Sequence, residues 1–448
     1  MRTAAHVACH SYSPDTICKR EPDVKLSNLA LALLAMLTLV GCQPTVYLMP
    51  TPEALRSGEH DPFAANPEAQ QKNQVTVAYA TNRLPVGLRH QRGYVTLYDD
   101  NIRLGAAQVR IGTEQLSAEE LYAQSTTAAR EFPIPLTLEQ AVELGQLDAE
   151  DEIAAPPAQL QAFFDTLNNA LERSVDKDLV VYVHGANNNF YRSMAQGAQY
   201  HHFTGRNSVI LVYSWPSAES FLRYAVDVNN ARASAPVFAR LLDLLARHTQ
   251  ARHIDVLAYS AGAQIVSPAL AQLRQSYADE DVASLQKRLR LGEVYFAAPD
   301  VDFVPFLDDL YTYIGMPKHV TLATNPGDFV LALAAGEHGV SRAGAPDTDE
   351  LTEEERQALI AATREMPFDV IWVEPDLIPG LGRRSHSFWY DHPWISTDVL
   401  LQFLYHARPA QRGLVAWENE TQARVWYFPP DYPQRVDAAI NQLKAAGR

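Results

Sequence analysis

Cysteine is scarce in this sequence of 448 residues, and its three copies, Cys9, Cys18 and Cys42, all stand near the N-terminus. A scaffold held by disulfide bonds is therefore excluded, and so is a cysteine metal site after position 42. Basic charge is also short, because 37 lysines and arginines face 53 acidic residues, a formal net charge of -16. This balance argues against sequence-independent binding of nucleic acid. The apolar fraction, 47%, is ample for a packed core and argues against disorder.

An apolar run long enough to span a membrane is lacking as well. The most apolar stretch, Leu29–Val40, has about a dozen residues, whereas a spanning helix needs about 20. It ends in Leu39-Val40-Gly41-Cys42, which resembles the lipobox of bacterial lipoproteins. We therefore predict that residues 1–42 are a lipoprotein signal peptide and that Cys42 carries the lipid. Gln43 follows the cysteine in place of aspartate, which implies the periplasmic face of the outer membrane. Acidic residues ahead of the run are unusual for a signal peptide, so a translation start at Val24 is an alternative.

The rest of the chain predicts a short tether and one large domain. Residues 43–73 are rich in proline, glutamate, glutamine and asparagine, which is typical of a flexible linker. From residue 74 to 408, strand-like runs alternate with helical patterns after an all-strand beginning. This order predicts an α/β fold with a mostly parallel twisted sheet, helices on both faces and an antiparallel start. Helical insertions are expected at about 113–177 and 335–366, and residues 409–448 are expected to pack on the domain as an extension.

The expected strands and helices are the following. The strands are Val75–Ala80, Tyr94–Tyr98, Ala107–Ile111, Leu179–His184, Val209–Ser214, Ile254–Tyr259, Glu293–Ala297, Val320–Ala323 and Val370–Val373. The helices are Ala218–Arg247, Ala261–Ser276 and Ser396–His406, with helix-like stretches at Leu160–Leu171 and Thr352–Thr363.

A candidate nucleophile stands between the strand Ile254–Tyr259 and a helix. The strand runs directly into Ser260-Ala261-Gly262, which is the strand–serine–helix order of a nucleophile elbow. The tight turn of an elbow needs small residues two positions before and after the serine, and Ala258 and Gly262 are small. A serine that merely caps the helix is the alternative.

A second loop supplies the donors that such a serine needs. The strand Val180–Val183 ends in His184-Gly185-Ala186-Asn187-Asn188, and a His-Gly turn at this place contributes one N–H to an oxyanion hole. We expect the two donors to be the N–H of Ala261 and that of Ala186 or Asn187. Trp215, Tyr259 and His184 are candidates for the wall of a pocket, and ordinary core packing is the alternative for each.

An acid and a base follow in the chain order Ser…Asp…His. Asp328 lies in the loop after the strand Val320–Ala323 and is the candidate acid. His386, which follows the strand Val370–Val373, is the candidate base. The alternatives for the acid are Asp300, Asp302 and Glu374. The alternative for the base is His392, whereas His406 on a helix is expected at the surface.

These motifs, taken in order, resemble the α/β-hydrolases of the uncharacterised family DUF900. The resemblance covers about Val75 to Arg408, and the elbow departs from it because Ala-His-Ser-Met-Gly is commoner there than Ala-Tyr-Ser-Ala-Gly. It implies serine hydrolase chemistry on an ester or a related acyl substrate. The matching pieces are Tyr79–Arg83, Val183–Asn188, Ser214–Ser217, Ala258–Gly262, Ala298–Asp300, Asn325–Asp328 and Ser385–Ser387.

The sequence thus predicts a membrane-anchored serine hydrolase that cleaves a carboxylic ester through an acyl-enzyme. A thioesterase or an amidase is the alternative within enzymes, and a non-catalytic envelope lipoprotein that binds or scaffolds is the alternative outside them. The expected partners are an ester or acyl small molecule or lipid, and the membrane through the N-terminal lipid. No metal or cofactor motif such as His-Glu-x-x-His or a phosphate loop occurs, so none is expected. The oligomeric state is left open.

Overall fold

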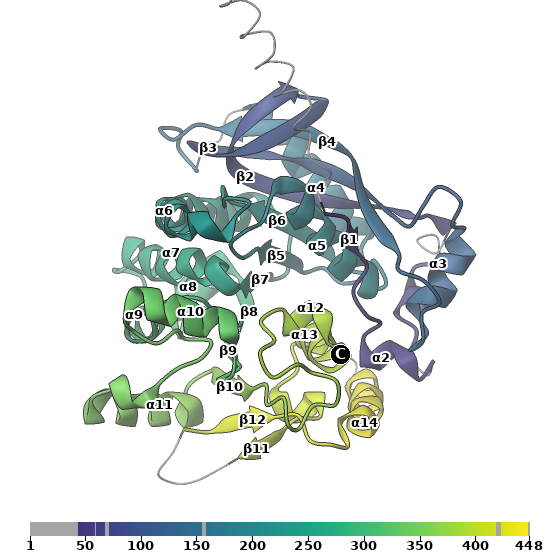
Figure 1. The fold of residues 1–448 in the computed structure, drawn as a ribbon. Coiled ribbons are helices and arrows are strands. Elements are labelled where there is room, and N and C mark those ends of the chain that lie inside the picture. The colour runs from purple at the N-terminus through teal and green to yellow at the C-terminus, as the bar shows by residue number, and fades with distance from the viewer. Residues whose placement is uncertain (1–43, 59, 68–70, 155–157, 418–422, 447–448) are drawn as a thin grey trace, which may run out of the picture. The chain divides into compact units, whose positions relative to one another are not determined.

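The central strands form where the sequence concentrates β-branched and aromatic residues in short runs. In the computed structural model, these runs join one sheet with the strand order β1-β4-β3-β2-β6-β5-β7-β8-β9-β10-β12-β11 (Figure 1). The structure describes residues 44–58, 60–67, 71–154, 158–417 and 423–446. The chain divides into two units, Met1–Thr45 and Val46–Arg448, and the sheet lies in the second.

The elements of the second unit have the following bounds. The strands are β1 (Val46–Tyr47), β2 (Gln74–Leu88), β3 (Gln91–Ile111), β4 (Pro135–Leu147), β5 (Leu179–Val183), β6 (Val209–Ser214), β7 (Ile254–Tyr259), β8 (Leu291–Ala297), β9 (His319–Thr324), β10 (Phe368–Trp372), β11 (Val415–Trp417) and β12 (Val425–Tyr427). The α-helices are α2 (Glu53–Arg56), α3 (Ala118–Ser125), α4 (Gln161–Arg173), α5 (Phe190–Phe203), α6 (Tyr224–His248), α7 (Ala263–Ser276), α8 (Val282–Leu289), α9 (Phe303–Tyr313), α10 (Phe329–His338), α11 (Glu353–Glu365), α12 (Phe388–Asp391), α13 (Pro393–Tyr405) and α14 (Tyr432–Ala445).

The sheet is antiparallel at its start, as the sequence predicts, parallel through its middle, and antiparallel again at its last pair, β12 and β11. Strands β1, β4, β3 and β2 pair antiparallel, whereas β2 through β6, β5, β7, β8, β9 and β10 to β12 pair parallel. The parallel strands are continuous apolar runs because helices cover both of their faces. The predicted fold class, a mostly parallel sheet with an antiparallel start, is confirmed.

Side chains of each strand alternate between two cores on opposite faces of the sheet. In β5, Leu179, Val181 and Val183 join one core, and Val180 and Tyr182 join the other. Helices α4, α6, α7, α8 and α9 contribute to the first core, and α5, α13 and α14 contribute to the second (Figure 1). The parallel strands are therefore held rigidly from both sides, which fixes the loops at their carboxyl ends.

The antiparallel part departs from the sequence prediction in two ways. The two expected strands Tyr94–Tyr98 and Ala107–Ile111 are one strand, β3, because the polar residues between them stay extended. Strand β4, which the sequence analysis did not identify, lies in the segment 113–177 and pairs with β3. Its alternation is hidden because Glu143 is a buried member of β4, 5% exposed, and forms ion pairs with Arg89 and Arg92.

The segment predicted to be a flexible tether, 43–73, is packed where the structure describes it. Leu48, Met49 and Phe63 are buried there, and β1 adds to the sheet beside β4. Arg130 donates hydrogen bonds to the carbonyl oxygens of Leu48 and Met49, at 2.9 and 3.1 Å. The tether prediction is wrong between residues 46 and 67, because the partners of these apolar residues come from distant parts of the chain and leave no local period.

Two further parts of the chain bear on the predicted organisation. The predicted signal peptide, its lipobox and Cys42 lie outside the described residues. Among the residues that are described, no helix is long and apolar enough to cross a membrane. In the segment after residue 408, β12 pairs with β10, and α14 contributes Tyr432, Val436 and Ile440 to the second core.

An ion-pair cluster ties α13 to the amino ends of the parallel strands. Asp178, fully buried ahead of β5, accepts hydrogen bonds from Arg252 at 2.9 and 3.0 Å and from His406 Nε2 at 2.7 Å. His406 Nδ1 lies 3.4 Å from Glu293 of β8. The prediction that His406 lies at the surface is wrong, because this side chain is only 20% exposed and faces two buried carboxylates.

Replacing His406 with glutamine is expected to lower the free energy of unfolding by about 2–3 kcal/mol near neutral pH, because it removes a cation from buried carboxylates. Burial lowers the pKa of His406, but hydrogen bonds to Asp178 and Glu293 outweigh it and raise the pKa to about 10. Its stabilisation is therefore complete below the ordinary histidine pKa and is lost as the pH rises toward 10. Denaturant unfolding at several pH values checks this, with the exposed His90→Gln as control. A difference between wild type and H406Q that does not shrink with rising pH would contradict it.

Candidate active site

Ser260 occupies a strained turn between β7 and the helical segment that leads into α7. Its φ is 52°, in the left-handed region that costs a residue with a side chain about 1–3 kcal/mol. A Cβ at Gly262 would stand 2.6 Å from the carbonyl oxygen of Val183, so glycine is required there. Ala258, at the end of β7, is fully buried and also small. These features are those of a nucleophile elbow, which holds the serine at the carboxyl edge of the sheet.

The structure brings Ser260, His386 and Asp328 into one hydrogen-bonded line. Ser260 Oγ lies 2.8 Å from His386 Nε2, and His386 Nδ1 lies 2.7 Å from Asp328 Oδ2. The three residues are widely separated in the sequence. Ser260 lies in the turn after β7, Asp328 in the loop after β9 and His386 in the loop after β10. The carboxyl ends of parallel strands meet at one edge of the sheet, which is why the three loops converge.

Local hydrogen bonds position Asp328 and His386, the candidate acid and base. Asp328 is the N-cap of α10, where its Oδ1 accepts the N–H groups of Val330 at 2.9 Å and Leu331 at 3.2 Å. The other oxygen, Oδ2, is thereby turned toward His386. Asn325 joins the two loops, because its Nδ2 donates to the carbonyl oxygen of Ser385 at 2.8 Å. The Asn-x-x-Asp turn therefore places the acid and holds the loop that carries the histidine.

The alternative acids have other partners. Asp300 accepts a hydrogen bond from Arg342 Nε at 2.7 Å, and Asp302 is paired with the same guanidinium group. Glu374 accepts the backbone N–H of Asp376 at 3.3 Å. None of these three carboxylates has a hydrogen bond to His386 among the described contacts.

Both ring nitrogens of His392, the alternative base, have hydrogen-bond partners. His392 Nε2 lies 3.0 Å from the carbonyl oxygen of Pro379, and Nδ1 accepts the N–H of Trp394 at 3.2 Å. Burial lowers the pKa of His392, which fits this neutral, capping role at the start of α13. Both nitrogens are thus engaged away from Ser260.

The His-Gly turn lies against the serine turn. A Cβ at Gly185 would stand 2.9 Å from Ser260 Cβ, so the two turns are in close contact. Asn187 has a φ of 52°, and its N–H donates to Asp227 Oδ2 at 3.1 Å. Of the two residues left open for this donor, Asn187 therefore has a partner already, and Ala186 is the better placed.

Two charged residues that the sequence analysis did not single out hold this turn. Asp227 of α6 accepts the N–H groups of both Asn187 and Ala218. Arg83, fully buried at the bulged part of β2, donates to the carbonyl oxygen of Asn188 at 2.8 Å and to Ser214 Oγ at 3.1 Å. Arg83 belongs to the Tyr79–Arg83 motif, and its charge amid apolar strand residues was the available signal.

The three predicted pocket side chains separate into two groups. A cavity of about 160 Å³ opens at Ser260, and Tyr259 lines it together with Ala186, Asn187 and His386. His184 and Trp215 are fully buried and do not line it. Their rings stack 5.2 Å apart, and Trp215 Nε1 donates to the carbonyl oxygen of His184 at 2.7 Å. Burial lowers the pKa of His184 to about 3, so a neutral ring supports the turn from beneath.

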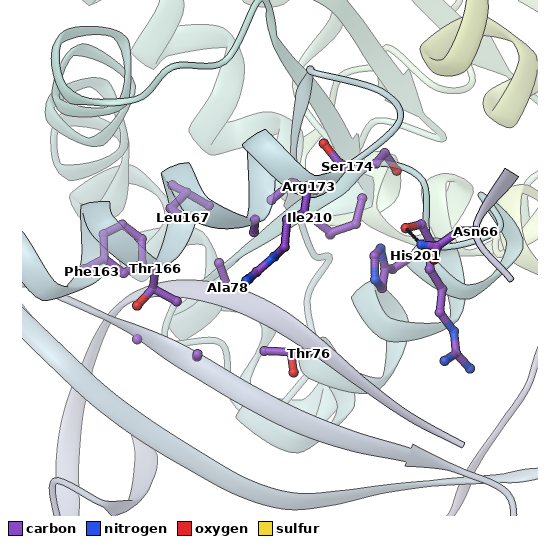
Figure 2. A pocket seen from close by; sticks show the side chains of 16 residues that line it. Asn66, Thr76, Ala78, Phe163, Thr166, Leu167, Arg173, Ser174, His201 and Ile210 are labelled. Atoms are coloured by element: carbon purple, nitrogen blue, oxygen red, sulfur yellow. Dashed lines mark hydrogen bonds between the residues drawn. The ribbon is translucent and has the colours of Figure 1, made fainter. Parts of the chain in front are cut away.

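A larger cavity lies away from this site, between α4, α5 and the antiparallel strands. It measures about 310 Å³ and contains none of the predicted site residues. Figure 2 shows Phe163, Thr166 and Leu167 of α4 on one side of it and His201 on the other. Its walls are a mixture of helix and strand side chains.

One group of side chains has the composition of a metal site. Asp178, His253 and His406 each offer a ligand atom within 4.8 Å of the others. Arg252, however, donates to both oxygens of Asp178, and Lys318 Nζ lies 2.5 Å from His253 Nε2. Two resident cations make this group an ion-pair cluster rather than a place for a metal ion.

Comparison with known proteins agrees with the geometry. No curated protein matches the chain. Residues 159–374 match the model of the family described as "Alpha/beta hydrolase of unknown function (DUF900)". The match spans β5 to β10 and includes Ser260 and Asp328, and it ends ahead of His386. Over this segment, the parallel core of the chain, the protein is similar to the DUF900 family of α/β-hydrolases.

Proposed function

We propose that the protein is a serine hydrolase that cleaves a carboxylic ester with Ser260, His386 and Asp328 as its catalytic triad. The observation that carries the proposal is the line of two hydrogen bonds, 2.8 Å from Ser260 Oγ to His386 Nε2 and 2.7 Å from His386 Nδ1 to Asp328 Oδ2. A serine hydroxyl acts as a nucleophile when a neighbouring base takes its proton and a third group orients that base. The two hydrogen bonds support both of these roles.

The chemistry follows from the direction of these hydrogen bonds. Nδ1–H of His386 donates to Asp328, which leaves Nε2 to take the Ser260 proton as Oγ attacks the carbonyl carbon. Asp328 stabilises the imidazolium that forms. The imidazolium then gives its proton to the departing alcohol, and an acyl-enzyme remains. Water, deprotonated by Nε2, attacks the acyl carbon and releases the acid, and Ser260 regains its proton.

The negative charge on the substrate oxygen needs fixed donors. We assign these to the N–H groups of Ala261 and Ala186, because the N–H of Asn187 is bonded to Asp227. Each such donor is worth about 3 kcal/mol in the transition state. Ala261 lies in the helical segment Ser260–Gly262 that leads into α7, where the helix dipole adds to the stabilisation.

The Ser260→Ala variant tests the triad directly. It is expected to lose essentially all hydrolysis of p-nitrophenyl acetate and all labelling by a fluorophosphonate probe, because no other described serine faces His386 Nε2. Its melting temperature is expected to stay close to that of the wild type. Ser276→Ala, an exposed serine of the following helix, is the matched control and keeps both activities. A wild-type protein that neither labels nor hydrolyses esters would instead support a binding or scaffolding role.

The same assay separates the chemical classes of substrate. Ester, thioester and amide analogues with one acyl group share the acyl-enzyme, so they differ only in the leaving group. The proposal expects the ester to have the highest kcat/KM. A higher value for the thioester or the amide would replace the ester by that class while leaving the triad in place.

The oxyanion turn has its own test in Asp227→Ala. Loss of this carboxylate frees the N–H groups of Asn187 and Ala218, so the turn that carries Ala186 is no longer held. We expect kcat to fall by about tenfold or more with a small change in KM, because the donors act in the transition state. Asp243→Ala, on the same helix but paired with Arg247, is the control for helix stability. Equal losses in the two variants would argue against the role of Asp227.

We further propose that the protein acts in the bacterial envelope, anchored by a lipid on Cys42 and facing the periplasm at the outer membrane. The apolar run and the Leu39-Val40-Gly41-Cys42 sequence support this proposal. Attachment of acyl chains to a single cysteine is sufficient for stable anchoring when more than one chain is added.

Cys42→Ser tests the anchor. In a bacterial host, the wild type is expected to incorporate an alkyne-labelled fatty acid and to sediment with membranes. The variant is expected to lose the label and to be processed differently, because the modified thiol is gone. Cys18→Ser, ahead of the apolar run, is the control. Labelling that survives in the Cys42 variant would overturn the assignment.

A further inference from the structure

A second cavity adjoins the one at Ser260 and differs from it in character. It measures about 380 Å³ and is lined by Phe329, Val330, Leu333 and Ala334 of α10, with Glu337 from the same helix. Tyr224 of α6 and Asp300 complete the wall. Tyr224, Asp300 and Val330 line both cavities, so the two spaces lie next to each other.

The polar groups at the junction are satisfied by one another. Asp300 is 1% exposed and accepts hydrogen bonds from Tyr224 OH at 2.6 Å and Arg342 Nε at 2.7 Å. The Tyr224 hydroxyl is therefore committed to Asp300, and the Asp300 charge is balanced by Arg342. What the junction offers a ligand is the aromatic ring of Tyr224 and the methyl groups of Val330.

The first turns of α10 expose apolar side chains to this space. Phe329 is 46% and Leu333 is 60% exposed, and their spacing of four residues places them on one side of the helix. The lining of the Ser260 cavity also has a polar part, which includes Asn188, Arg192 and Gln196. One part of an ester placed at Ser260 thus meets apolar side chains, and the other part meets polar ones.

We propose that the cavity between α6 and α10 binds the apolar arm of the ester that Ser260 cleaves. The proposal rests on the proposed function, and it adds the substrate class: an ester with one unbranched hydrocarbon arm and one smaller or polar arm. Asp328 caps the helix whose next residues form the apolar wall, so one element sets both the acid and the substrate's position. Burial of methylene groups against Leu333 and Ala334 favours an ester with a longer hydrocarbon arm.

Ala334→Leu is the variant that tests this pocket. Ala334 is buried in the wall, so the added side chain fills the space that the hydrocarbon arm occupies. Ala332→Leu makes the same change on the exposed side of α10, outside the cavity lining, and is the matched control. Leu333→Gln, at a position that is already largely exposed, is a second variant that folding tolerates.

The readout is the ratio of kcat/KM for p-nitrophenyl octanoate to that for p-nitrophenyl acetate. We expect this ratio to fall by about tenfold or more in A334L and less steeply in L333Q, and to be unchanged in A332L. Octyl acetate, compared with ethyl acetate, tells whether the hydrocarbon arm is the alcohol instead of the acid. A ratio that is unchanged for both pairs of esters in A334L would overturn the proposal.

A binding measurement keeps the pocket separate from the catalysis. Calorimetric titration of S260A with sodium octanoate is expected to show binding that S260A/A334L lacks and S260A/A332L keeps. If the wild type hydrolyses no ester but octanoate still binds in this pattern, the proposed function fails while the apolar pocket stands. If esters are cleaved but A334L removes no chain-length preference, the proposed function stands and the apolar pocket fails.

Discussion

The close approach of two turns at the carboxyl edge of the sheet is the constraint on which the site depends. The serine turn after β7 lies against the end of β5, where a Cβ at Gly262 would meet the Val183 carbonyl oxygen at 2.6 Å. From the other side, a Cβ at Gly185 would meet Ser260 itself at 2.9 Å. Gly185 of the His-Gly motif and Gly262 of the serine motif therefore both permit the contact between the two turns. Because the strands beneath are fixed by cores on both faces, this contact has little freedom to relax.

Three buried guanidinium groups have hydrogen-bond partners in neighbouring segments, and for two of them the partner is a carboxylate. Arg83 binds the loop after β5, Arg342 binds Asp300 after β8, and the fully buried Arg412 binds Asp398 of α13 at 2.7 Å. An ion pair of this kind returns little net stability, since two charges must leave water. Its geometric demand is strict, however, because a guanidinium group donates in a fixed plane. Such pairs specify where a loop lies, which apolar contacts alone would leave less well defined.

Much of the parallel core could be predicted from the sequence, because each strand there is a short apolar run with small residues at its exit. Strands β6 and β7 begin and end where the sequence places them, and Ser260, Asp328 and His386 emerge from chain order and loop position. The antiparallel part was harder, since the buried Glu143 interrupts the apolar alternation of β4. Residues 46–67 gave no local signal because their partners lie far along the chain. Tyr224 and Asp227 were also missed, since a polar residue on a long helix looks the same whether it faces solvent or a site.

A histidine paired with an aspartate is not in itself a mark of catalysis in this protein. In the part of the chain that the structure describes, three histidines lie within 2.7 Å of an aspartate oxygen: His386 of Asp328, His406 of Asp178, and His319 of Asp369. What separates them is the remaining hydrogen-bonding capacity. Asp178 is also bound by Arg252, His406 reaches a second carboxylate at Glu293, and Asp369 accepts the indole N–H of Trp426. His386 alone of the three directs its second nitrogen to a hydroxyl group, at the mouth of a cavity. At the amino ends of the strands, the further partners of these pairs are Arg252, Glu293 and Trp426. At the carboxyl edge, His386 Nε2 can still accept the proton of a hydroxyl group. This difference makes the pair of His386 and Asp328 a candidate for chemistry.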